Sequence, residues 1–297
     1  MTSPFSSTVA FGRSAIVLAV FLQALGKVVY GTWLGAVPSN LFVFLSFALT
    51  AAFFFVVSGR GVGERAWGPL LLLNVATAVT FIAFFYALKL IEPAIVGAVD
   101  IGVGPILVVL ITLAITGRRP TGLRVIVCLG ILIGCAILVL AALRGTRFAS
   151  SGVQAWLGLG ASLVAGVGAV FITMSSRTLL GRGWTFGAVL AHRFYLILVV
   201  SSRLAFGSGQ DAVSWTGGLV AMILAVSAIG VLAPLYLLQI GVGRCDPYTV
   251  MVTMAAQPML TLCIEVFSPV YAWSSLTALG VAIISGFLIL DVAAGRR

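Results

Sequence analysis

Long apolar runs, separated by short polar breaks, dominate the sequence. They lie at residues 14 to 36, 39 to 58, 67 to 90, 93 to 116, 121 to 143, 155 to 179, 184 to 206, 215 to 240, 247 to 268 and 271 to 292. Each run has about the 20 mostly apolar residues that a helix needs to cross a bilayer. The breaks are rich in Gly, Arg, Pro and Ser, which suits turns between antiparallel helices. The chain is therefore predicted to be an all-α integral membrane protein with ten transmembrane helices.

The composition excludes a soluble globular protein. Hydrophobic residues make up 61% of the chain and charged residues only 8%. A soluble protein of this composition would expose very large apolar patches. The first run is longer than the apolar core of a signal peptide and no clean cleavage site follows it, so we interpret it as the first membrane helix.

The net charge of +10 does not indicate a nucleic-acid partner, because Lys and Arg stand singly or in pairs at the ends of runs and form no basic face. If the N-terminus is cytoplasmic, the cytoplasmic run ends carry Arg13, Arg60, Arg65, Arg118, Arg119, Arg124, Arg177, Arg182, Arg244, Arg296 and Arg297. The opposite ends carry only Lys27, Lys89, Arg144, Arg147 and Arg203. By the positive-inside rule, both termini are predicted to be cytoplasmic. Tryptophans near run ends are predicted to be interfacial anchors, namely Trp33, Trp67, Trp184, Trp215 and Trp273.

The two halves of the chain repeat the same pattern. Phe85-Tyr86-Ala87-Leu88-Lys89-Leu90 is followed by Glu92-Pro93, and Leu235-Tyr236-Leu237-Leu238-Gln239-Ile240 is followed by Asp246-Pro247. We therefore expect a first five-helix repeat in residues 1–150 and a second in residues 151–297. Because five is odd, the two copies enter the membrane from opposite sides, which gives an inverted repeat around a central cavity. Inverted repeats of this kind support alternating access in transporters.

Prolines at matching places predict hinges. Pro105 and Pro258 lie inside the fourth helix of each repeat, where each removes a hydrogen bond and should kink the helix. Gly102 and Gly104 soften the same turn in the first copy. The alternative is that prolines and glycines are simply commoner in membrane helices.

Polar residues within the runs predict a binding site, since an ionisable side chain in a membrane helix costs roughly 2.5 to 3.5 kcal/mol. Helical spacing collects these residues on faces of the first, third, fourth, sixth, seventh and ninth runs. The candidate substrate-binding residues are Gln23, Lys27, Asn74, Thr77, Phe81, Phe85, Tyr86, Asp100, His192, Tyr195, Thr253 and Gln257.

This residue set suits a small zwitterion. Lys27 is expected to meet a substrate carboxylate and Asp100 a substrate amine, while Asn74 and Gln257 fix the orientation of the solute. Plainer readings stay open. Lys27 can snorkel to the interface, Asp100 can neutralise Lys27 or Arg193 in an ion pair, and His192 can be a hydrogen-bonded core residue.

Enzyme signatures are absent from the sequence. It has neither His-Glu-x-x-His nor Gly-x-Ser-x-Gly nor a phosphate-binding loop, and it contains a single histidine. No metal site or cofactor is expected, and the four cysteines, Cys128, Cys135, Cys245 and Cys263, are interpreted as buried small hydrophobes. Asp100 and Glu265 would be the carboxylate pair of an intramembrane enzyme, although Glu265 is expected at the interface.

Several segments resemble the drug/metabolite transporter superfamily, in its EamA-type branch of ten-helix bacterial exporters. They are Tyr86-Ala87-Leu88-Lys89 with Glu92-Pro93-Ala94, Pro105 with its counterpart Pro258, His192-Arg193-Phe194-Tyr195, and Leu279-Gly280-Val281 to Gly286. The resemblance implies a basket of helices around a central cavity, with the fifth helix of each repeat at the periphery. It also implies export of amino acids or similar metabolites, and a fold-supporting role for Arg193. Gly102-Val103-Gly104-Pro105 lacks the aromatic residues that precede this proline in aromatic amino-acid exporters, which leaves the substrate open.

Together these features predict a monomeric exporter of amino acids or related small metabolites in the cell inner membrane. Its expected partners are the solute and the lipid bilayer. One alternative is an exporter of lipophilic cations or drugs, which would use Asp100 and the aromatic residues without needing Lys27. An alternative of another class is an intramembrane enzyme or receptor.

Overall fold

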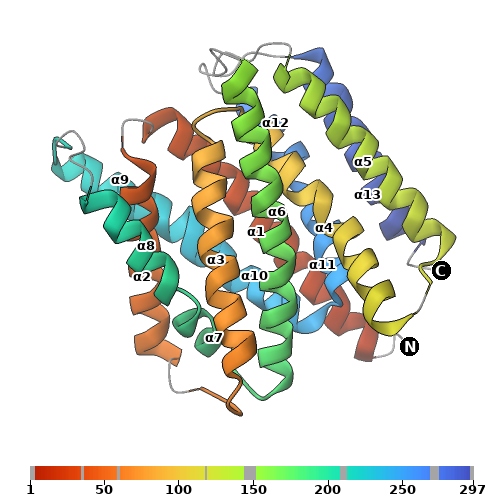
Figure 1. The fold of residues 1–297 in the computed structure, drawn as a ribbon, viewed down its shortest axis with the longest axis horizontal. Coiled ribbons are helices and arrows are strands. Elements are labelled where there is room, and N and C mark those ends of the chain that lie inside the picture. The colour runs from red at the N-terminus through yellow and green to blue at the C-terminus, as the bar shows by residue number, and fades with distance from the viewer. Residues whose placement is uncertain are drawn as a thin grey trace.

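The computed structural model describes residues 4–34, 37–58, 61–117, 119–143, 152–207, 213–267 and 274–294. These residues form helices joined by short turns, with no strand among them (Figure 1). Nine helical segments of this part of the chain are long and apolar enough to cross a membrane. The prediction of a multi-pass helical membrane protein is confirmed. The residues outside the described part include Arg60, Arg118, Arg144, Arg147, Arg296, Arg297 and Trp273.

The first half of the chain consists of continuous helices. They are α1 (Pro4–Trp33), α2 (Ser39–Ser58), α3 (Trp67–Ala87), α4 (Pro93–Thr116) and α5 (Gly122–Leu143). The bounds of α2 to α5 follow the predicted runs closely, because Gly, Pro and charged residues end most apolar stretches, whereas α1 begins at Pro4, before the predicted run at residue 14.

The second half contains both continuous and interrupted helices. The continuous ones are α6 (Gly152–Gly181) and α13 (Ser275–Ala294). Three predicted runs are interrupted instead. They form α7 (Phe186–His192) with α8 (Tyr195–Phe206), α9 (Gly217–Ser227) with a π-helical turn η1 (Ala228–Leu232) and α10 (Ala233–Arg244), and α11 (Pro247–Met254) with α12 (Gln257–Glu265).

The two acidic-proline pairs each start a helix. Pro93 begins α4 and Pro247 begins α11, where a missing N–H costs no helical hydrogen bond. The Asp246 carboxylate also caps α11 by accepting a hydrogen bond from the backbone N–H of Thr249 at 3.2 Å.

The two predicted hinge prolines behave differently. Helix α4 runs unbroken through Pro105, whereas the ninth run divides just before Pro258, which occupies the first turn of α12. A Cβ atom at Gly102 would lie 2.0 Å from Cys135 Sγ, and one at Gly104 would lie 2.8 Å from Met251 Sδ. These glycines therefore permit close packing of α4 against α5 and α11.

Helix pairs from the two halves pack side by side. Helix α3 packs along α6 and α1 along α10, while α5 and α13 form a pair at one edge of the molecule (Figure 1). Small residues allow the α5–α13 approach, because a Cβ at Gly134 would lie 2.5 Å from Ile284 Cγ1.

The outer surface is apolar, as the membrane prediction requires. Trp33, Trp67 and Trp215 are exposed near helix ends, consistent with interfacial anchors. Trp184 is buried instead, and its indole N–H donates to the backbone oxygen of Glu64 at 3.0 Å, so it ties two connecting segments together. Glu265, expected at the interface, is also buried.

Candidate functional site

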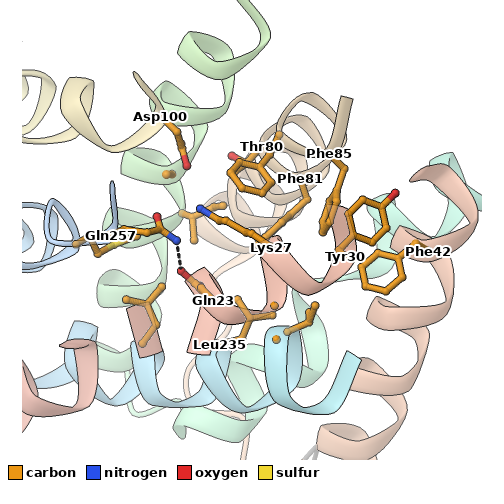
Figure 2. Close-up of a pocket in the computed structure, with 18 of the residues that line it drawn as sticks. Gln23, Lys27, Tyr30, Phe42, Thr80, Phe81, Phe85, Asp100, Leu235 and Gln257 are labelled. Carbon is orange, nitrogen blue, oxygen red and sulfur yellow. Dashed lines mark hydrogen bonds between the residues drawn. The ribbon is translucent and has the colours of Figure 1, made fainter. Parts of the chain in front are cut away.

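A cavity of about 100 Å³ lies within the helix bundle (Figure 2). Since one water molecule needs roughly 10 to 15 Å³ by this measure, the cavity has room for several waters or a small solute. Its walls come from α1, α3, α4, α6, the α7–α8 break and the α11–α12 break, as the sequence predicts. Helix α2 and the α9–η1–α10 span also contribute, which the spacing of polar residues did not reveal because their lining residues are apolar.

Lys27 and Asp100 form the charged part of the cavity. Both side chains are only 9% exposed, and neither Lys27 Nζ nor Asp100 Oδ1 has a hydrogen-bond partner. The ammonium lies 4.4 Å from the centroid of the Phe84 ring, which stabilises a cation in an apolar setting. Figure 2 shows the Lys27 side chain extending toward Asp100 and Gln257.

Glycines on the neighbouring helices make room for these charges. A Cβ at Gly97 on α4 would lie 3.5 Å from Lys27 Nζ, so the ammonium lies against a bare stretch of helix. A Cβ at Gly166 on α6 would lie 2.1 Å from the carbonyl oxygen of Asp100, so only glycine lets α6 approach there. Asp100, which lines the cavity, therefore lies at a close crossing of α4 and α6.

An amide pair joins α1 to α12 across the cavity. Gln257 Nε2 donates a hydrogen bond to Gln23 Oε1 at 3.2 Å (Figure 2). Gln257 is the first residue of α12, so the break in the ninth span places its side chain at the cavity.

Aromatic rings pack at the other end of the cavity. The Tyr30 ring centroid lies 4.6 Å from that of Phe42 and 5.6 Å from that of Phe85, and the latter two are 5.6 Å apart. All three side chains are buried and line the cavity (Figure 2). We call Tyr30, Phe42 and Phe85 the aromatic triad.

The π-helical turn η1 lies against α1 beside the cavity. A Cβ at Gly26 would lie 2.6 Å from Gly230 Cα, so the two backbones are in contact. Gly230 and Val231 of this turn line the cavity. Such π-helical turns are frequent at functional sites, because they displace residues from regular helical positions.

Asn74 holds the α7–α8 break. Its Nδ2 donates to the backbone oxygens of His192 at 2.9 Å and Leu70 at 3.0 Å. Its Oδ1 accepts from the backbone N–H groups of Tyr195 at 3.0 Å and Leu196 at 3.4 Å. One side chain thereby satisfies backbone groups that the interruption releases, as buried polar groups require. The interruption carries Arg193, which is 2% exposed and lines the cavity.

Six of the twelve predicted binding residues line the cavity. They are Gln23, Lys27, Phe81, Phe85, Asp100 and Gln257. Asn74, Thr77 and Thr253 are buried outside the lining, and Thr253 donates to the backbone oxygen of Thr249 at 2.7 Å. Tyr86 and Tyr195 are about half exposed, at 47% and 50%, and the Tyr195 hydroxyl is hydrogen-bonded to the His192 ring.

Other lining residues are not among the twelve candidates. Phe42 and Val231 give no signal by spacing, since apolar residues surround them in apolar runs. Phe84 and Thr173 lie on the helix faces that spacing predicts to face the cavity, and Thr80 carries the weak signal of a hydroxyl in a membrane helix. Arg193 carries a strong one, a cation within a span, which the sequence reading assigned to fold support.

Comparisons with known proteins support the fold alone. No family model matches the chain, and a search of curated proteins found no match. A solved structure titled only "Crystal structure of protein" is similar, with a TM-score of 0.71 and 24% sequence identity over 98% of this chain and 99% of that one. The whole helical arrangement therefore occurs in a protein of known structure.

Proposed function

We propose that this protein is a membrane transporter that binds a small zwitterion, an amino acid or a related metabolite, in the central cavity. The observation that carries the proposal is the pair of buried, unpartnered charges, Lys27 and Asp100, facing one solute-sized space. Buried charges without partners are costly in a membrane and mark solute pathways. A solute with both an amine and an acidic group offers a partner to each sign of charge.

The packing pattern supports two related halves. Suppose that each membrane span of the first half is exchanged with the span at the same place in the second half, so that α1 corresponds to α6 and α3 to the span that contains α10. The α1–α10 pair then becomes the α6–α3 pair. The α4–α6 contact likewise becomes the contact of α1 with α11 and α12, and the α5–α13 pair maps onto itself. This exchange is what inverted repeats 1–150 and 151–297 would produce, and it favours an alternating-access exporter of the EamA type.

Interrupted helices at the cavity give further support. The α7–α8 break, η1 and the α11–α12 break each contribute lining residues or residues next to them, namely Arg193, Gly230 and Gln257. Secondary transporters bind solutes near the bilayer midplane at such discontinuous helices.

Counterflow of radiolabelled amino acids in proteoliposomes tests the proposal. Asp100→Asn keeps the shape of the side chain and removes its charge, so we expect it to abolish transport while the purified protein stays monodisperse. Normal flux in this variant would reject a solute contact for Asp100. Inhibition by a cationic dye but not by amino acids would instead favour the lipophilic-cation exporter. No flux of any solute would favour an intramembrane enzyme or receptor.

A further inference from the structure

Arg193 is a second cation at the cavity. The residue is 2% exposed, and its Nε is buried without an acceptor among the residues that the structure describes. The guanidinium lies beside the Phe194 ring, with Cζ 5.2 Å from the centroid. An arginine that supports a fold donates hydrogen bonds to carbonyls or carboxylates of adjacent helices, so this geometry does not fit the fold-supporting role that the family resemblance implies.

The two cavity cations differ in their surroundings. The ammonium of Lys27 lies 4.4 Å from the centroid of the Phe84 ring, and its side chain extends toward Asp100 and Gln257 (Figure 2). The guanidinium of Arg193 lies instead beside the Phe194 ring, at the α7–α8 break.

The backbone fixes Arg193 at the cavity. The residue lies in the α7–α8 break, whose two sides are joined by the Asn74 side chain. The next residue, Phe194, is fully buried and its ring centroid lies 5.1 Å from that of Phe47. A regular helix would distribute positions 192 to 195 around its axis, so the break and its two anchors determine where the Arg193 side chain emerges.

We propose that Arg193 binds the acidic group of the transported solute, a carboxylate. This inference rests on the proposed transport function and specifies which cation recognises the solute. A guanidinium presents parallel N–H donors that match the two oxygens of a carboxylate, which an ammonium does not. A guanidinium held rigidly at a solute-sized cavity, with its Nε lacking an acceptor, is preorganised for such a ligand.

The test compares an amino acid with its carboxamide, for example phenylalanine with phenylalaninamide, as competitors in the counterflow assay. The two keep the same amine and side chain and differ in the acidic group. Wild-type protein is expected to prefer the acid by roughly 10- to 100-fold, the range for one hydrogen bond to a charged group. Arg193→Gln should reduce this preference to near unity, and Arg193→Lys should retain part of it.

Two variants serve as comparisons. Lys27→Gln should keep the preference for the acid, whatever its total flux. Arg203→Gln removes an exposed arginine farther along α8 and should change nothing. Preference retained in Arg193→Gln, or lost in Lys27→Gln, would overturn the assignment. If Arg193→Gln does not fold, the Lys27→Gln result and the partial preference of Arg193→Lys still decide.

Failure of the inference and failure of the proposed function give different results. Wild-type protein that carries amino acids with a preference independent of Arg193 contradicts only this assignment. Wild-type protein that carries no amino acid at all contradicts the transport proposal itself.

Discussion

The Asn74 side chain is predicted to be a large contributor to stability because it joins the interrupted seventh span to α3. Asn74→Leu keeps the number and branching of the side-chain heavy atoms and removes the hydrogen bonds to the backbone of His192, Tyr195 and Leu196. Side-chain hydrogen bonds in membrane proteins contribute about 0.6 kcal/mol on average and up to about 1.7 kcal/mol. Loss of three such bonds is expected to lower the free energy of unfolding by about 2 to 5 kcal/mol.

The assay is reversible unfolding by SDS in mixed micelles, followed by circular dichroism. Thr77→Val is a matched control, because Thr77 lies one turn along α3 and is fully buried, but its hydroxyl has no hydrogen-bond partner. Removing an unpartnered buried hydroxyl should leave stability unchanged or raise it by about 1 kcal/mol. Equal stability of Asn74→Leu and wild type would refute the reasoning, as would a Thr77→Val variant as unstable as Asn74→Leu.

Two further predictions concern a helix crossing and a buried carboxyl group. Gly26→Ala should lower stability by about 1 to 3 kcal/mol through overpacking, because its Cβ would lie 2.6 Å from Gly230 Cα. Gly160→Ala is the control, since open space surrounds this position, and it should raise stability by about 0.5 to 1 kcal/mol. Equal melting temperatures for the two variants would contradict this prediction. Burial raises the pKa of Glu92, in the turn before α4, from 4.5 to about 7. The folded state therefore retains a proton that the unfolded state releases, so stability from this group is present below pH 4.5 and is lost as the pH rises through about 7. Thermal melting of Glu92→Gln at a series of pH values should not show this loss of stability. A variant with the same pH profile as wild type would contradict the prediction.

The sequence predicts the membrane helices well because each is specified locally. A run such as 67 to 90 needs only length and apolarity to cross a bilayer, and Trp67 and the turn after Ala87 define its ends. The starts of α4 and α11 are equally local, since Pro93 and Pro247 cannot continue a preceding helix.

Interruptions are harder to predict because their cause lies elsewhere in the fold. No residue between Phe186 and Phe206 predicts the break at Arg193, because neither Gly nor Pro lies next to this position. The break is stable because Asn74, more than 100 residues earlier, supplies the missing hydrogen bonds. Spacing correctly identified Asn74 as a buried polar residue on the inner face of α3 but could not distinguish a backbone partner from a solute contact.

The sequence identifies the polar residues of the cavity, but their contacts depend on other helices. Lys27, Asp100 and Gln257 were identified because polar groups in apolar spans are rare and costly. The choice between a snorkelling Lys27 and a cavity Lys27 depends on where Gly97 and Phe84 lie, and these come from other helices. Of the aromatic triad, Phe85 was predicted from helical spacing, whereas Phe42 gave no signal, because it resembles the lipid-facing phenylalanines of its run.

The distribution of interruptions bears on how the proposed transport cycle would proceed. The two halves match in packing, yet the described helices of the first half are continuous and three spans of the second half are interrupted. Bending at the α11–α12 break costs no further helical hydrogen bonds, whereas bending at the α7–α8 break would strain the Asn74 hydrogen bonds and bending α4 at Pro105 would disturb a continuous helix. Opening and closing of the cavity is therefore expected to concentrate at the α11–α12 break. Gln257, at this break, would then move relative to Lys27 and Asp100, which lie on continuous helices.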